Sequence, residues 1–190
     1  PSKYLKDYFY KIKNLTQKIV TQFGIENGPL YFQFLIGKDG IKVNEIACRI
    51  GGAYEGDFMP KLTGVDLLQM MVELAAGQQS DQSELENYSI QDNENHLSSQ
   101  LFFAGPGEIK KITSSSELLK LPGVLKAGLN YESGDKIAEI ENATARAGYF
   151  IVMADNKNQL QQRVTAVYDN LKIIDQNGKN LVLRDIGENF

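Results

Sequence analysis

The sequence predicts an α+β protein, with antiparallel strands and helices in its first part and a small α+β domain after it. Three observations lead to this prediction. Between Lys3 and Phe23 the apolar residues recur at steps of three and four, which is the spacing of one helix face. Residues 30–36 and 41–47 are rich in Leu, Tyr, Phe, Ile and Val, as strands are. From His96 onward short strand patterns mix with short helical patterns, which is typical of α+β domains.

The chain of 190 residues is long enough for two small domains. We expect the first over residues 1–78 and the second over residues 96–190. Residues 79–95 lie between them and are nearly free of apolar side chains, so they are expected to form a linker or an exposed loop, with a mobile lid as the alternative. The chain begins with Pro1 and enters a helical pattern at once, so we also expect it to be part of a longer protein.

The turn signal Lys38-Asp39-Gly40 predicts that the two strands of the first domain form a hairpin. A three-residue loop that ends on a left-handed glycine fixes how the strands pair. The expected pairs are Gly37 with Ile41, Leu35 with Val43, and Gln33 with Glu45. Directly opposed residues have Cβ atoms about 4.5–5.5 Å apart, so an amide oxygen and a carboxylate at the last pair can share a cation.

The other elements follow from caps, breakers and periodicity. A helix is expected from Thr63 to Gly77, because Thr63 and Asp66 have capping-box spacing and Gly77 is a stop signal. Asn156 is expected to cap a helix over residues 157–172. The second domain is completed by a short helix capped by Ser115 or Ser116 and by strands at 96–104, 108–112, 124–132, 145–154 and 181–183.

Composition excludes several classes of site and partner. The net charge of −4 gives no general attraction to nucleic acid or to a membrane surface. No apolar run approaches the roughly 18 residues that span a bilayer, and a cytoplasmic protein is expected. The single cysteine, Cys48, excludes an internal disulfide and a CxxC metal site, and the single histidine, His96, excludes a site built from several histidines. We expect Cys48 to be buried and inert.

Gln33, Glu45 and Arg49 form the candidate site. Mg²⁺ is a hard cation that takes oxygen ligands and shares one or two carboxylates with substrate phosphates. Glu45 can supply a charged oxygen ligand and Gln33 a neutral one. Arg49 follows the second strand, and its planar guanidinium suits two-point binding of phosphate or carboxylate. After it, Gly51 and Gly52 allow backbone amides to approach an anion closely.

Simpler interpretations of the same residues remain open. Gln33 and Glu45 can be a polar pair on a solvent-exposed face, with Arg49 neutralising the carboxylate. Against this, the expected register places the pair on a face that also carries Tyr31, Leu35, Ile41 and Val43. The stretch Gly51–Asp57 is either a binding loop beside the strands or a plain turn.

The stretch from Gly28 to Gly77 resembles the C-terminal half of an ATP-grasp domain. This superfamily of ATP-dependent carboxylate–amine ligases includes carbamoyl phosphate synthetase and biotin carboxylase. GPLYFQF is similar to the family's strand with the first metal ligand, NEIACRIGG to its strand with the second ligand and the phosphate-binding arginine, and TGVDLLQMMVELAAG to the helix that follows. More loosely, GEIKKI, LPGV, GDKI and the run that starts at RAGYFIVMA resemble the closing domain of L-amino-acid ligase-like proteins.

The resemblance implies a ligase that uses ATP to join a carboxylate to an amine or a thiol through an acyl phosphate. It implies that Gln33 and Glu45 bind Mg²⁺ or Mn²⁺, that Arg49 is the catalytic contact to phosphate, and that Gly51 and Gly52 belong to the nucleotide site. The implied ligands are ATP, a small carboxylate and an amine. The implied partner is the missing N-terminal part of the same protein, a homodimer is a candidate assembly, and the isolated chain is expected to be inactive.

Two positions depart from the family's pattern. Many members have Glu where Gln33 stands, although carbamoyl phosphate synthetases often have Gln there. Many also have Asn where Ala47 stands, as a further metal ligand, so the second metal position is in doubt. The alternative function is therefore a non-catalytic module, derived from an ATP-grasp domain, that serves in assembly or ligand binding.

Overall fold

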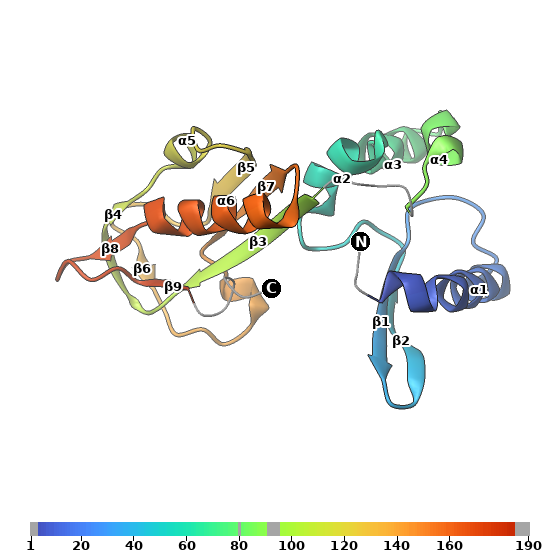
Figure 1. Ribbon diagram of the computed structural model, residues 1–190, viewed down its shortest axis with the longest axis horizontal. Coiled ribbons are helices and arrows are strands. Elements are labelled where there is room, and N and C mark those ends of the chain that lie inside the picture. The colour runs from blue at the N-terminus through green and yellow to red at the C-terminus, as the bar shows by residue number, and fades with distance from the viewer. Residues whose placement is uncertain (1–3, 80, 91–95, 185–190) are drawn as a thin grey trace. The chain divides into compact units, whose positions relative to one another are not determined.

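The computed structural model describes residues 4–79, 81–90 and 96–184, which divide into two compact units, Pro1–Asn93 and Glu94–Phe190 (Figure 1). Both units combine helices with antiparallel strands, so the predicted α+β class is confirmed. None of the helices described in these ranges is long and apolar enough to cross a membrane. The elements of the first unit are α1 (Leu5–Phe23), β1 (Tyr31–Gly37), β2 (Gly40–Ala47), α2 (Glu55–Thr63), α3 (Leu67–Ala75) and α4 (Ser83–Asn87).

The hairpin of β1 and β2 closes through a tighter turn than the sequence predicts. Gly37 pairs with Gly40, so only Lys38 and Asp39 lie in the loop and the expected three-residue loop is wrong. Gly40 is left-handed as expected, with φ of 87°. The tighter turn moves the pairing by one residue, to Ile36 with Ile41, Leu35 with Lys42, and Phe34 with Val43.

A β-bulge then restores the pairing of Gln33 with Glu45. The register shifts between Gln33 and Phe34, which leaves Asn44 as the extra residue of β2. The tighter turn and the bulge offset each other, so the predicted pair is confirmed although the loop that led to it is wrong. The predicted surroundings of the pair are wrong in part, because Ile41 pairs with Ile36 and Val43 with Phe34, on the other face from Gln33. Tyr31 and Leu35 alternate with Gln33 along β1 and share its face as predicted.

Helix α3 begins later than the sequence predicts, because Asp66 rather than Thr63 is its cap. The Asp66 carboxylate accepts a hydrogen bond of 2.9 Å from the Gln69 amide. Thr63 instead ends α2, and its hydroxyl donates to the Met59 carbonyl at 2.8 Å. Helices α2 and α4 have no counterpart in the sequence-based prediction. The latter lies in the expected linker, of which residues 80 and 91–95 fall outside the described residues.

The first unit buries little of its apolar surface. Within the described part of this unit, Val65 alone is fully buried, with 4% of its surface exposed. By contrast, Phe23 is 75% exposed, Tyr10 72% and Leu35 59%. A unit with so few buried side chains gains little stability from burial of its own apolar surface.

The second unit contains two antiparallel sheets. The four-stranded sheet has the order β5-β7-β3-β9, and the three-stranded sheet has the order β6-β4-β8. Each strand predicted from the sequence is present, whereas β6 and β8 are additional. The elements are β3 (His96–Ala104), β4 (Gly107–Ile112), α5 (Ser115–Leu118), β5 (Val124–Leu129), β6 (Lys136–Ile137), the 3-10 helix η1 (Ala143–Ala145), β7 (Gly148–Ala154), α6 (Lys157–Asn170), β8 (Ile173–Asp175) and β9 (Val182–Leu183).

Two caps start the helices of this unit. Asn156 caps α6 as predicted, and its side chain accepts from the Gln159 amide at 2.9 Å. At α5 the cap is Ser114, one residue before the predicted positions, in a complete capping box with Glu117. Hydrogen bonds from the Ser114 backbone and side chain hold the pKa of the Glu117 carboxyl below its usual value.

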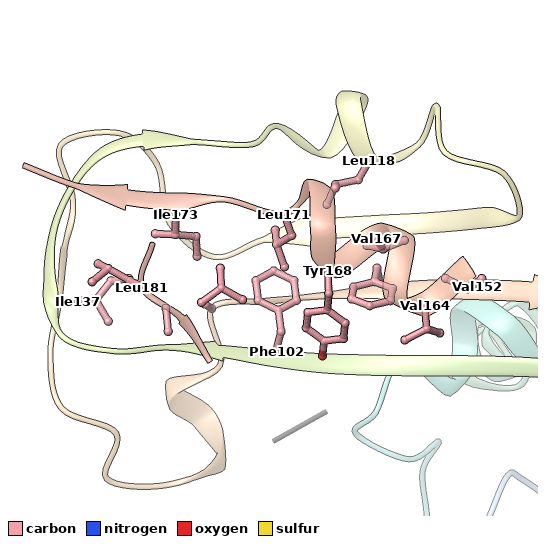
Figure 2. Close-up of a cluster of buried hydrophobic side chains, with 14 of the residues drawn as sticks. Phe102, Leu118, Ile137, Val152, Val164, Val167, Tyr168, Leu171, Ile173 and Leu181 are labelled. Atoms are coloured by element: carbon pink, nitrogen blue, oxygen red, sulfur yellow. The ribbon is translucent and has the colours of Figure 1, made fainter. Parts of the chain in front are cut away.

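The core of the second unit lies between α6 and the strands β3 and β7, on which the helix packs (Figure 2). Phe102, Phe150 and Tyr168 are each at most 1% exposed. The Phe150 ring lies 5.2 Å from that of Tyr168, edge to face, and 6.3 Å from that of Phe102. Gly148 permits this packing, since a Cβ atom there would lie 2.5 Å from the Phe102 ring and 2.3 Å from the Gly128 carbonyl oxygen.

Candidate functional site

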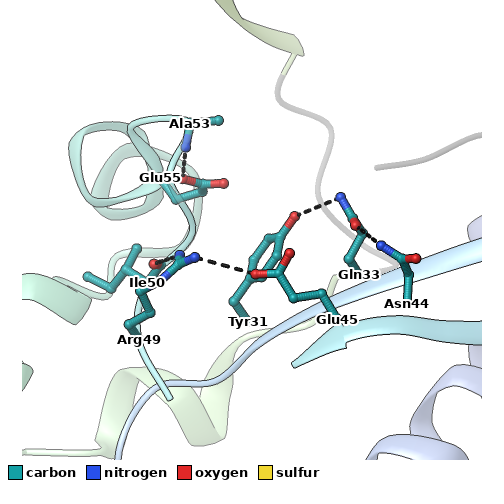
Figure 3. A network of polar contacts seen from close by, with 8 residues as sticks. All are labelled: Tyr31, Gln33, Asn44, Glu45, Arg49, Ile50, Ala53 and Glu55. Carbon is teal, nitrogen blue, oxygen red and sulfur yellow. Dashed lines mark hydrogen bonds and ion pairs between the residues drawn. The ribbon is translucent and has the colours of Figure 1, made fainter. Parts of the chain in front are cut away.

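Two of the predicted site residues, Gln33 and Glu45, lie opposite each other on one face of the β1–β2 hairpin, and Arg49, Gly51 and Gly52 follow β2. Figure 3 shows the side chains of Tyr31, Gln33, Asn44 and Glu45 on the same side of the two strands. Gln33, Asn44 and Glu45 are exposed, so a ligand can reach them from solvent. The β-bulge explains why two consecutive residues of β2 share this face, because both lie opposite the single residue Gln33.

Arg49 lies beside Glu45, as the sequence predicts. Its Nη2 atom is 3.4 Å from Glu45 Oε1, and its Nη1 atom donates to the Ile50 carbonyl at 2.8 Å. The guanidinium also lies 5.7 Å from the centre of the Tyr31 ring. The Arg49 and Glu45 side chains are 50% and 46% exposed, so their ion pair adds little to stability and the charges stay accessible to a ligand.

Asn44 is a site residue that sequence reasoning missed. Its Nδ2 atom donates to Gln33 Oε1, and Gln33 Nε2 donates to the Tyr31 hydroxyl at 3.5 Å. The strand pattern carries no signal for Asn44, because a regular strand would direct it away from Glu45. Only the bulge brings it onto the site's face.

The glycines after Arg49 differ in their surroundings. A Cβ atom on Gly51 would lie 2.2 Å from Glu55 Oε1, so the Glu55 carboxylate already occupies the space over this glycine. Glu55 Oε2 accepts from the Ala53 amide at 2.7 Å. Gly52 has open space on that side. That Gly51 and Gly52 hold an anion therefore stays a prediction, and Gly52 is the more accessible of the two.

The backbone between Gly52 and α2 contains a strained residue. Tyr54 has φ of 64°, and it is the one non-glycine residue with positive φ in the described ranges. This conformation is costly for an aromatic residue and occurs mostly where structure or function demands it. Helix α2 starts directly afterwards at Glu55, so residues 51–54 are a short connection into it. That this connection is a binding loop stays a prediction.

The oxygen atoms on this face fit a hard cation such as Mg²⁺. Glu45 carries one carboxylate, and Gln33 and Asn44 carry carboxamides, with no nitrogen or sulfur ligand type among the three. Gln33 Oε1 accepts from Asn44 in this structure, so that oxygen would have to turn toward Glu45 to bind the same cation. In the ranges that the structure describes, no group of three or more His, Cys, Asp or Glu side chains could hold a metal. Cys48 is exposed at the end of β2, so the expectation that it is buried is wrong.

A family model and a curated relative match the chain. Residues 100–175 match the L-amino acid ligase C-terminal domain 2. The L-arginine-specific L-amino acid ligase of Bacillus subtilis is 24% identical over 163 residues, which cover 84% of this chain and 37% of that protein. The chain therefore spans less than two thirds of this relative.

Solved structures of ligases and of a carboxylase domain share the fold. Phosphoribosylglycinamide synthetase from Anaerococcus prevotii has a TM-score of 0.77 at 17% identity, covering 93% of this chain and 44% of that chain. L-Amino acid ligase from Bacillus licheniformis has a TM-score of 0.75 at 21% identity, covering 93% and 45%. The biotin carboxylase domain of Hydrogenobacter thermophilus 2-oxoglutarate carboxylase, a dimer with MgADP, ADP and bicarbonate, has a TM-score of 0.62 at 16% identity, covering 91% and 37%.

These matches agree with the motifs of the sequence. The motif residues lie on the hairpin and on the helices that follow it, and the family model falls on the second unit. Residues 100–175 are therefore similar to the L-amino acid ligase C-terminal domain 2, and the chain shares its fold with part of the solved phosphoribosylglycinamide synthetase and L-amino acid ligase structures.

Proposed function

We propose that this chain is the C-terminal part of an ATP-dependent ligase that joins a carboxylate to an amine, with amino acids as the substrate class. ATP would phosphorylate the carboxylate to an acyl phosphate, and the amine would then displace phosphate. The observation that carries the proposal is the pairing of Gln33 with Glu45, with the Arg49 guanidinium 3.4 Å from that carboxylate. The L-amino acid ligase matches support the choice of substrate class.

Each side chain has a distinct task in this proposal. Glu45 and Gln33 would hold Mg²⁺ through one charged and one neutral oxygen. The bound ion supplies neutralisation of the negative charge on the phosphoryl oxygens. The Arg49 guanidinium would turn from Glu45 toward the acyl phosphate and stabilise the negative charge of the phosphate group by two-point hydrogen bonding. Its exposed position leaves room for that movement.

The rest of the ligase would complete the first unit. This unit carries a groove of about 630 Å³ that is lined by apolar residues such as Leu67 and Leu74 and by polar residues such as Glu26 and Gln78. Large apolar side chains such as Phe23 also remain exposed. Because the chain covers only 37% of the curated relative, we propose that other parts of the same ligase cover this surface and bring the remaining nucleotide contacts.

Hydroxylamine trapping tests the proposal on the full-length protein. An acyl phosphate reacts with hydroxylamine to give a hydroxamate, so a hydroxamate should form with ATP and an amino acid and should require both. ADP release should depend on the same pair. If none of the common amino acids, alone or in pairs, yields ADP or hydroxamate above background, the ligase proposal is contradicted and the non-catalytic module is favoured.

A further inference from the structure

Gln33 differs from a glutamate ligand in one chemical respect. A carboxylate presents two equivalent oxygens to a cation, whereas a carboxamide presents one oxygen and one NH₂ group, and only the oxygen can bind a cation. A metal site that uses Gln33 therefore needs a neighbouring interaction that fixes which end of the amide faces Glu45. Asn44 contacts this amide directly.

The hydrogen bonds of Gln33 place its oxygen away from Glu45. Gln33 Oε1 accepts from Asn44 Nδ2, and Gln33 Nε2 points toward the Tyr31 hydroxyl at 3.5 Å. Figure 3 shows that Tyr31 and Glu45 lie on the nitrogen side of the amide and Asn44 on its oxygen side. In this arrangement Gln33 does not present its oxygen to a cation held by Glu45.

The same three side chains support the reverse arrangement without losing a hydrogen bond. Asn44 carries an acceptor as well as donors, and the Tyr31 hydroxyl can donate as well as accept. When both amides turn over, Asn44 Oδ1 accepts from Gln33 Nε2, and Gln33 Oε1 faces Tyr31 and Glu45. An alanine at position 44 would remove the hydrogen bond that the Asn44 carboxamide makes to Gln33 in either orientation of the Gln33 amide.

We propose that Asn44 is a positioning residue, which holds the Gln33 oxygen toward Glu45 when a divalent cation is bound. The inference rests on the proposed function, because it assumes the Gln33–Glu45 metal site. The β-bulge has a role in it, since only this irregularity brings Asn44 next to Gln33 on the face of Glu45. Outer-shell partners of this kind orient ligands and tune metal affinity.

A double-mutant cycle tests the inference on the full-length protein with ADP. The measured quantity is the apparent dissociation constant of Mn²⁺, followed by the electron paramagnetic resonance signal of Mn²⁺. Asn44→Ala should weaken Mn²⁺ binding by about tenfold, which is the range of outer-shell substitutions. In the Gln33→Glu background, Asn44→Ala should change the dissociation constant by less than about twofold. The two oxygens of a carboxylate are equivalent, so Asn44 has no amide to orient there, and the double-mutant cycle measures this difference.

Asn87→Ala is the matched control, since it removes an exposed asparagine on α4 whose side chain donates to the Ser83 carbonyl, and it should leave Mn²⁺ binding unchanged. An equal loss from Asn44→Ala in both backgrounds would indicate damage to the bulge and overturn the inference. So would the absence of any loss in the Gln33 background. The metal site has its own check, because Mn²⁺ binding that is unaffected by Glu45→Gln overturns the proposed function itself.

Discussion

Replacing Glu45 with glutamine should lower ATP-dependent ligation by the full-length protein about a hundredfold or more. The substitution keeps the size of the side chain and removes the only carboxylate of the Gln33–Asn44–Glu45 face. A bound divalent cation contributes several kcal/mol of charge stabilisation in the transition state, and 1.36 kcal/mol corresponds to a factor of ten in rate. The measurement is the rate of ADP release at saturating substrate.

Glu73→Gln makes the same chemical change on a half-buried residue of α3, outside the hairpin, and is the control. Glu73 lies on α3 and accepts a hydrogen bond from the Gln69 side chain. It should leave the rate within about twofold of the wild-type rate, as expected for a surface substitution away from the site. A Glu45→Gln protein that turns over at the wild-type rate would exclude Glu45 as a metal ligand.

Replacing Phe150 with alanine should destabilise the second unit by about 3–5 kcal/mol. Phe150 is fully buried, and its ring packs against the rings of Phe102 and Tyr168. Removal of the ring loses the burial of its apolar surface and leaves a cavity that the sheet and α6 cannot close. The measurement is the free energy of unfolding in urea, followed on amide resonances of β7.

Leu119→Ala provides the comparison within the same unit. Leu119 is 46% exposed at the end of α5, so its truncation should cost about 0.5 kcal/mol or less. If the Phe150 and Leu119 substitutions cost the same, the core between α6 and the strands β3 and β7 is not what stabilises this unit.

The sequence predicts those elements that rest on local signals. The helix predicted from the periodicity before Gly24 is confirmed over Leu5–Phe23, whereas Lys3 lies outside the described residues. The strand patterns of the second unit are confirmed, and the Asn156 cap stands where it was expected. Local signals compete at residues 63–66, where two residues can each cap a helix. There the structure uses Thr63 to end α2 and Asp66 to start α3.

The arrangement of the candidate site depends on features that no local pattern carries. A strand sequence does not reveal a bulge, so the sequence predicts the Gln33–Glu45 pair through the wrong loop and misses Asn44. Glu55 lies over Gly51 and directly follows Tyr54, whose positive φ is unexpected for an aromatic residue. Many family members have Asn where Ala47 stands, and nothing in the sequence indicates that Asn44 places a carboxamide on the same face instead.

The most direct test of the metal–phosphate site is a spectroscopic measurement on the full-length protein with Mn²⁺ and ADP. Glutamate is labelled with ¹³C at its side-chain carboxylate, and electron–nuclear double resonance detects labelled carbons next to the bound Mn²⁺ together with the phosphorus atoms of ADP. We expect a ¹³C coupling from a coordinated carboxylate that disappears in the Glu45→Gln protein. A ¹³C coupling that persists in this variant, or a wild-type spectrum with phosphorus couplings alone, would contradict the assignment of Glu45.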